Sequence, residues 1–230
     1  MRVLLLAVAL GAVAPVAWPA ADPTQPHAPQ MQFVPPAAGS YQLQRIQRVP
    51  NGRLLDAQGR LIPLRTVTHG KVTLLTFFYT YCTDAWGCPF AYTLMQGLRE
   101  RLLAQPRDSD RVRFVSISFD PTHDTPEALR LYAGGLKHDG RVPWHFLTAR
   151  STAELLPLLD DFGQDVRIER DQIGRPLRTI NHMLKLFLID RAGMVREIYA
   201  LDYLHPDMML NDIQTLLLEE EAATVPAALR

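Results

Sequence analysis

An uncharged apolar segment that leads into the two cysteines of this 230-residue chain is the feature that most restricts its fold. Val72–Tyr79 consists only of Val, Thr, Leu, Phe and Tyr. A run of this kind is typical of a strand that is buried on both faces. Both faces of such a strand must be covered, so the segment favours an α/β fold with helices on the two sides of a sheet.

The segment after this strand predicts a chemical site at the start of a helix. Cys82 and Cys88 follow the strand, and Phe90–Leu103 carries apolar residues at helical spacing, with Pro89 suited to the first helical turn. The positive end of a helix favours thiolate, which is both a nucleophile and a metal ligand. The alternative is an inert structural pair, but a loop between a strand and a helix normally lies at the surface.

The remainder of the domain alternates between strand and helix patterns. Two short strands are predicted within Leu54–Leu64, further strands at Arg111–Phe119, Trp144–Leu147, Leu184–Asp190 and Met194–Leu201, a loop or hairpin at Arg167–Thr179, and helices at Thr125–Leu136, Ser151–Phe162 and Pro206–Glu219. This order predicts a three-layer α/β sandwich, with a central mixed β-sheet and flanking helices.

The ends of the chain differ in composition from its middle. Residues 1–21 form a signal pattern of one arginine, an apolar run and small residues. That run is shorter than the roughly 20 residues that span a bilayer, and an uncleaved N-terminal anchor is the alternative. Residues 22–38 predict a Pro-rich linker. We therefore expect one folded domain at residues 39–222 and a short tail at residues 223–230.

Charge and cysteine content exclude several classes of function. Lys plus Arg and Asp plus Glu both total 24, so the charge gives no reason to expect a nucleic-acid partner. Two cysteines are too few for a disulfide scaffold. A redox pair or a metal site remains. Zinc structural sites need four protein ligands, whereas soft thiolates together with imidazole suit copper.

The third ligand of such a site must come from one of seven histidines. His182 lies just upstream of the Leu184–Asp190 strand, which should pair beside the cysteine strand. His123 follows the second buried strand at the edge where the cysteines emerge. From spacing alone, both remain open, and the ordinary alternative for each is a histidine without a metal role.

Four motifs in order resemble the SCO/SenC family of thioredoxin-like, copper-binding proteins. They are TFFYTYCTD…CPF, VSISFDPTHDTPEALRLYA, WHFLT and INHMLKLFLIDRAG, and the resemblance covers about Gly39 to Leu218. It implies a thioredoxin-like fold and the copper ligands Cys82, Cys88 and His182. Two departures stand out. This chain has five residues between its cysteines where the family pattern is Cys-x-x-x-Cys-Pro, and it has His123 where the family commonly has arginine.

The resemblance implies a non-enzymatic copper metallochaperone for the CuA centre of cytochrome c oxidase. Its partner would be a copper-receiving oxidase subunit or another copper carrier. It would be exported and periplasmic, either soluble or tethered to the inner membrane by residues 1–21. The copper would pass by exchange of thiolate and imidazole ligands. Independently of the resemblance, an exposed aromatic residue beside a transfer site often marks a docking surface, and we expect Trp86 in the cysteine loop to do so.

A thiol–disulfide oxidoreductase is the alternative, with Cys82 attacking and Cys88 resolving. Reductases of this fold usually carry a cis-proline before the strand that Leu184–Asp190 would form. The residues at that place are Asn181, His182 and Met183, which favours a metal ligand. A peroxidase and an interaction domain without chemistry remain as weaker alternatives.

Overall fold

The computed structural model describes residues 33–134, 136 and 140–224. The signal or anchor segment at 1–21, most of the 22–38 linker and the last residues of the tail lie outside this part of the chain. Within it, no helix combines the length and the apolar character that crossing a membrane requires.

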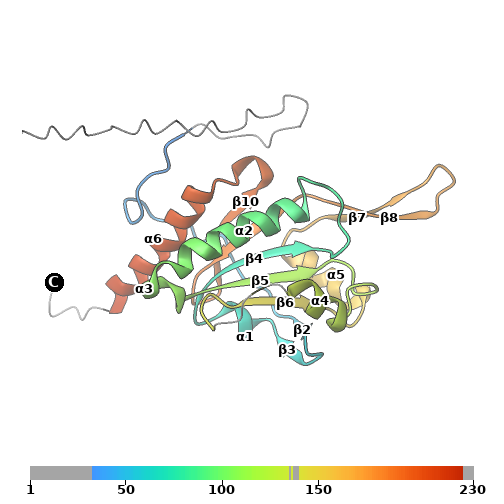
Figure 1. The fold of residues 1–230 in the computed structure, drawn as a ribbon, viewed down its shortest axis with the longest axis horizontal. Helices are drawn as coiled ribbons and strands as arrows, with labels where there is room; N and C mark the ends of the chain where they lie inside the picture. Colours follow the sequence, from blue (N-terminus) through green and yellow to red (C-terminus); the bar gives the residue numbers. More distant parts are fainter. Residues whose placement is uncertain (1–32, 135, 137–139, 225–230) are drawn as a thin grey trace, which may run out of the picture.

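An eight-stranded mixed sheet forms the centre of the domain (Figure 1). Its order is β1 (Gln47–Arg48), β10 (Met194–Ala200), β9 (Lys185–Ile189), β4 (Val72–Phe78), β5 (Val112–Ser118), β6 (Trp144–Thr148), β2 (Arg53–Asp56) and β3 (Leu61–Pro63). The strand β4 pairs in parallel with β5 and antiparallel with β9, so the predicted neighbour of the cysteine strand is confirmed. All seven residues of β4 and of β5 are buried.

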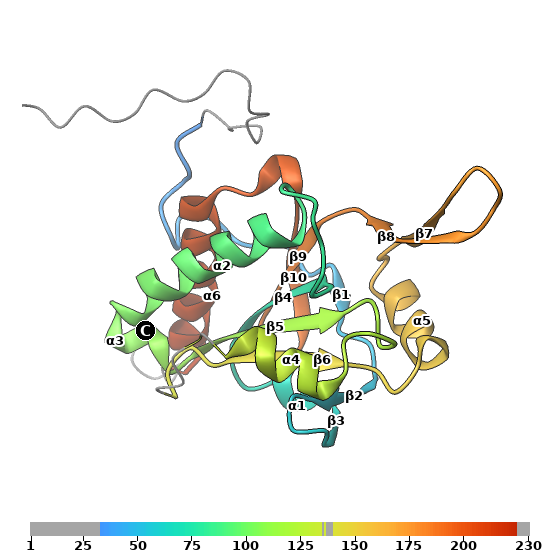
Figure 2. The ribbon, with the colours of Figure 1, turned by 45° about the vertical axis from the view of Figure 1, so that its right-hand side comes forward.

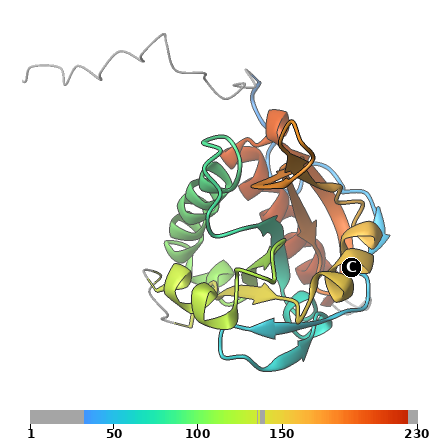
Figure 3. The same ribbon diagram turned by 90° about the vertical axis from the view of Figure 1, so that its right-hand side faces the viewer.

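Helices cover both faces of the sheet. Side chains alternate between the faces of a strand, so Phe77 and Phe78 of β4 point in opposite directions. Phe78 packs against Tyr132 of α4 (Pro126–Ala133), and Phe77 packs against Phe162 at the end of α5 (Thr152–Asp161). The long helices α2 (Cys88–Leu103) and α6 (Pro206–Thr224) run along the outside of the sheet (Figures 1 and 3). The predicted three-layer sandwich is confirmed.

The predicted helix starts coincide with side-chain caps. The Thr125 hydroxyl accepts a hydrogen bond from the Ala128 amide at 3.3 Å, and the Ser151 hydroxyl accepts one from Glu154 at the same distance. Each cap satisfies an amide that has no partner within its helix. The last helix is longer than predicted, because it continues past Glu219 to Thr224. The expected boundary at residue 222 therefore falls inside α6.

The segment for which a loop or a hairpin was predicted is a hairpin. Its strands are β7 (Val166–Arg170) and β8 (Pro176–His182), and it projects from the body of the domain (Figures 1 and 2). Sequence patterns missed the shortest elements, because two to four residues do not establish a period: these are β1, α1 (Arg65–Thr68), α3 (Pro106–Ser109) and the 3-10 turn η1 (Leu201–Tyr203).

Candidate thiol and metal site

The two cysteines lie together where β4 ends and α2 begins. Cys88 is the first residue of α2 and is buried, whereas Cys82 sits in the preceding turn and is partly exposed. Both are free thiols. The five residues between them fold back on themselves, since the Gly87 amide donates to the Asp84 carbonyl at 3.0 Å and the Trp86 amide donates to the Asp84 carboxylate at 3.1 Å. The wider loop therefore still brings the thiols into contact.

A buried carboxylate anchors the chain just before Cys82. Asp124 has no exposed surface, and it accepts hydrogen bonds from the Thr80 amide at 3.0 Å and from the hydroxyls of Thr80 and Ser118 at 2.5 Å each. Hydrogen bonds to an ionised acceptor are about twice as strong as neutral ones. Asp124 thus fastens the cysteine turn to the end of β5. This role was not predicted from the sequence, although Asp124 lies within the VSISFDPTHDTPEALRLYA motif.

The two thiols differ in their environment: Cys88 donates a hydrogen bond, and the Cys82 sulfur accepts it. A hydrogen bond from the Cys88 thiol lowers the pKa of Cys82 to about 5, helped by the Cys88 amide and the Tyr79 hydroxyl. Donation to Cys82, together with burial, raises the pKa of Cys88. The predicted effect of the helix terminus therefore lowers the pKa of Cys82, which receives the first amide of α2, whereas at Cys88 donation to Cys82 and burial outweigh it. At neutral pH the pair holds one proton, on Cys88.

His182 reaches the thiols from the base of the β7–β8 hairpin, where β8 ends. Its Nε2 lies 3.9 Å from the Cys88 Sγ, and its Nδ1 lies 3.0 Å from the Ile180 carbonyl oxygen. A carbonyl can only accept, so Nδ1 carries the hydrogen and Nε2 presents its lone pair toward the sulfur. The ring is held against Phe119 at a centroid distance of 4.6 Å. This is the arrangement of a metal-ligating imidazole whose second nitrogen is fixed by the backbone.

The distance from Cys88 to His182 is compatible with shared ligation. Bonds of about 2.3 Å to sulfur and about 2.05 Å to nitrogen, as at zinc, place the two atoms about 3.6 Å apart at a tetrahedral angle and about 3.8 Å apart at a trigonal one. The observed 3.9 Å requires little adjustment. Among the described residues, no group of three His, Cys, Asp or Glu side chains, this one included, is already arranged to hold a metal ion. The shared point is Cys88, which contacts both Cys82 and His182.

The other candidate, His123, lies beside the cysteine turn and has a partner of its own. Its Nδ1 is 2.6 Å from the Asp120 carboxylate, and its ring packs edge-on against Tyr81. The Tyr81 hydroxyl donates to the same carboxylate. His123 is half-exposed. The structure therefore joins His182 to the thiols and places His123 in a separate Tyr81–Asp120–His123 cluster.

A cleft of about 790 Å³ opens next to the thiols. Tyr81, Phe119 and His123 line one side of it, and α5 and the β7–β8 hairpin line the other with mostly apolar residues. Trp86, which the sequence suggested as an exposed docking residue, is half-buried and packs edge-on against Phe90 at 5.7 Å. The cleft therefore offers more exposed apolar surface beside the thiols than the side chain of Trp86 does.

The backbone before β9 also bears on the reductase alternative. The described residues contain no cis peptide bond, and Asn181, His182 and Met183 occupy the segment before β9. The site thus has an imidazole at the place where a thioredoxin-like reductase would carry its cis-proline.

Comparison with known proteins adds family relationships to this geometry. The family model described as SCO1/SenC matches residues 48–218. A curated SCO1 protein homolog from Bacillus subtilis is 35% identical over 102 residues, which cover 44% of this chain and 48% of the relative, so the match spans about half of that protein. The structure of Bradyrhizobium japonicum ScoI with copper bound has a TM-score of 0.57 at 22% identity, over 75% of this chain and 98% of the other. The structure of BsSco, described as having a disulfide switch and as a member of the Sco family of cytochrome c oxidase assembly proteins, has a TM-score of 0.57 at 26% identity, over 74% of this chain and 93% of the other.

Proposed function

This chain belongs to the SCO1/SenC family, and from that premise we propose that it is a copper-binding protein that delivers copper during assembly of cytochrome c oxidase. The single observation that carries the proposal is the approach of His182 Nε2 to the Cys88 sulfur, which is itself in contact with Cys82. Two thiols and an imidazole are a donor set that suits copper.

Cys82, Cys88 and His182 are the proposed ligands. Cys82 contributes a thiolate that already exists at neutral pH because of its low pKa. Cys88 must lose its proton when the metal binds, so binding releases about one proton from the pair near neutral pH. The fixed ring of His182 offers Nε2 without a change of tautomer. A preformed thiolate and a fixed imidazole tautomer both favour binding of a soft cation.

Three ligands leave room for an incoming one, and this is the basis of the proposed transfer. A thiolate of the recipient adds to the ion, and the bonds to this chain then break in turn. The exposed side of Cys82 is the open approach, since Cys88 is buried beneath it. The adjoining apolar cleft offers a surface on which the recipient, a copper-receiving oxidase subunit or another copper carrier, would dock.

A thiol–disulfide exchange function is the second candidate, and the low pKa of Cys82 favours it. Cys82 would attack a disulfide of the partner, one partner sulfur would leave as thiolate, and Cys88 would then displace the other to give a Cys82–Cys88 disulfide. The partner gains two electrons and the pair loses them. His182 has no part in disulfide exchange, whereas it is a ligand in the copper carrier. The two functions therefore differ in whether they require His182.

Export completes the proposal. Residues 1–21 carry the signal pattern, residues 22–38 the linker, and the domain that follows would work in the periplasm, either free or tethered through residues 1–21. We retain the domain limits of 39–222 and the 223–230 tail as the proposed organisation, with the helix α6 extending across the second boundary.

Anaerobic copper titration of the reduced protein tests the proposal. The wild type is expected to bind one equivalent and to give a thiolate-to-copper charge-transfer band with Cu(II). His182→Ala removes one of three ligands and is expected to weaken binding at least about tenfold, which corresponds to about 1.4 kcal/mol. His123→Ala is the matched control, because this histidine lies near the same turn but is bound to Asp120.

The two candidate functions predict opposite results for His182→Ala. If copper affinity is unchanged in His182→Ala while the rate of disulfide exchange with a dithiol partner is high in both proteins, the oxidoreductase reading replaces the copper carrier. If both histidine variants lose affinity equally, His182 has no special place in the site.

A further inference from the structure

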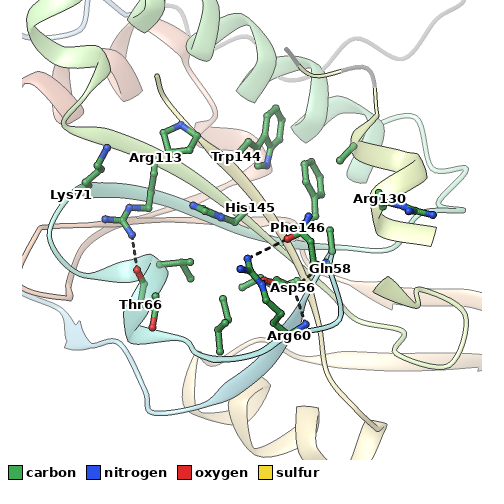
Figure 4. A pocket seen from close by; sticks show the side chains of 16 residues that line it. Asp56, Gln58, Arg60, Thr66, Lys71, Arg113, Arg130, Trp144, His145 and Phe146 are labelled. Carbon is green, nitrogen blue, oxygen red and sulfur yellow. Dashed lines mark hydrogen bonds and ion pairs between the residues drawn. The ribbon is translucent and has the colours of Figure 1, made fainter. Parts of the chain in front are cut away.

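A second cleft lies at the β6 side of the sheet and shares no residue with the thiol site (Figure 4). It has a volume of about 660 Å³, within the range of small-molecule sites. It exists because β2 pairs with β6 only at Leu55–Thr148 and Asp56–Leu147. The first residues of β6 therefore have no strand on that side, and the space is bounded by the β2–β3 turn, α1, the end of α4 and β6.

Positive charge dominates the lining of this cleft. Among the described residues that line it, four are cations (Arg60, Lys71, Arg113 and Arg130) and one, Asp56, is a carboxylate. That carboxylate is already engaged, because it accepts from the Arg60 guanidinium at 2.7 Å and from two backbone amides at 2.9 Å. Asp56 is therefore already paired with Arg60, and Arg130 pairs with Glu127 at 3.5 Å. Lys71 and Arg113 have no carboxylate partner among the described residues.

Arg113 differs from the other three cations because its side chain is buried. It extends from β5, is only 7% exposed, and donates to the carbonyl oxygens of Thr66 at 2.9 Å and His69 at 2.8 Å. These bonds cap the end of α1, which is a sufficient structural role for two of its nitrogens. Its Nε, however, is buried and has no hydrogen-bond partner. A buried cation with only neutral partners and an unused donor carries a desolvation penalty that an anion would offset.

Lys71 stands next to Arg113 at the same end of the cleft. It precedes β4, whose first residues pair with the start of β5, so that Thr73 lies opposite Arg113. The Lys71 side chain is half-buried and makes no hydrogen bond or ion pair with any described residue. Arg130 lies at the opposite end and points away from both (Figure 4). The two cations that can act together are Lys71 and Arg113.

The lining between the charged ends is mostly apolar but includes His145 (Figure 4). Ile62 and Val67 line the cleft on one side, and β6 contributes Trp144 and Phe146, of which only 5% and 3% is exposed. A guanidinium next to an ammonium matches a carboxylate or phosphate group, and apolar walls match a hydrocarbon or aromatic part. We propose that this cleft binds a small organic anion, with its carboxylate or phosphate at Lys71 and Arg113 and its apolar part against the walls.

Phenyl phosphate is the probe for this site, titrated into the full chain by calorimetry in a low-salt buffer free of other oxyanions. One-to-one saturable binding is expected. Inorganic phosphate should bind more weakly because it lacks the aromatic ring, and binding of phenol should be undetectable because it lacks the phosphate. In the NMR spectrum, the Arg113 Nε–H resonance is expected to shift on binding, because that donor gains its first partner.

Substitutions decide between this site and general attraction to a basic surface. Lys71→Gln removes a cation that holds nothing else in the fold and is expected to weaken phenyl phosphate at least about tenfold, the loss typical of one charge-assisted hydrogen bond. Arg130→Gln is the matched control and should leave the affinity unchanged. The proposal is overturned if phenyl phosphate does not saturate, if Lys71→Gln binds as the wild type does, or if both variants lose affinity equally. None of these readouts involves copper or the cysteines.

Discussion

The reactivity of Cys82 as a function of pH provides a quantitative test of the thiol site. The proposed perturbation is Cys88→Ala, which removes the strongest of the interactions that lower the pKa of Cys82. Cys88→Ser is the matched variant, because its hydroxyl can still donate to the Cys82 sulfur. The assay is the rate at which the reduced protein releases chromophore from an aromatic disulfide, measured between pH 6 and pH 8.

The expected rates follow from two opposing effects. At pH 6, a thiol with a pKa of about 5 is about 90% thiolate, whereas one with the ordinary value of 9.0 is about 0.1% thiolate, a ratio of roughly 900. A fall of four pKa units also lowers the intrinsic nucleophilicity by about 60-fold at a Brønsted slope near 0.45. Wild-type Cys82 should therefore react about 15-fold faster than an ordinary thiol at pH 6 and about fivefold slower at pH 8.

The shape of the profile discriminates more sharply than any single rate. The wild-type rate should be nearly flat from pH 6 to pH 8, because Cys82 is already ionised. The rate of Cys88→Ala should rise toward tenfold per pH unit as its pKa moves back toward 9.0, and Cys88→Ser should fall between the two. A wild-type rate that climbs steadily over this range, or a Cys88→Ala profile that overlies the wild type, would refute the assignment of the proton to Cys88.

Three further predictions concern stability. Asp124→Ala leaves the Thr80 amide and two hydroxyls without their buried acceptor and should lower the free energy of unfolding by about 3 kcal/mol in urea titration; a loss below about 1 kcal/mol would mean that the turn is not fastened there. Gly193→Ala places a Cβ into the His69 ring at a φ of +77° and should cost at least about 2 kcal/mol, part of which His69→Ala should restore; full stability of the single variant would contradict the packing. Burial raises the pKa of Asp212 above its value of 3.8 in the unfolded chain, so its contribution is fully present below pH 3.8 and is lost as pH rises through the folded pKa; Asp212→Asn should flatten this decline above pH 3.8, and an unchanged slope would show that another group causes it.

Local patterns in the sequence were sufficient for the elements of the fold. The buried strands, the helix starts at Thr125 and Ser151 and the successive strands β9 and β10 depend on residues close to one another in the chain, and each was predicted to within a few residues. The pair of cysteines at a strand-to-helix junction was equally visible. The motifs that resemble the SCO/SenC family added the thioredoxin-like fold and the choice of Cys82, Cys88 and His182 as candidate ligands.

Tertiary packing decided which of these residues meet. His182 and Cys88 are 94 positions apart, and no local pattern states that the ring turns its Nε2 to that sulfur. The proton balance between Cys82 and Cys88 depends on which thiol is buried, and burial is a property of the assembled layers. The cleft around Arg113 likewise results from the partial pairing of β2 with β6. Sequence periodicity encodes which face of an element is apolar, whereas contact, desolvation and charge compensation depend on what the rest of the chain places against that face.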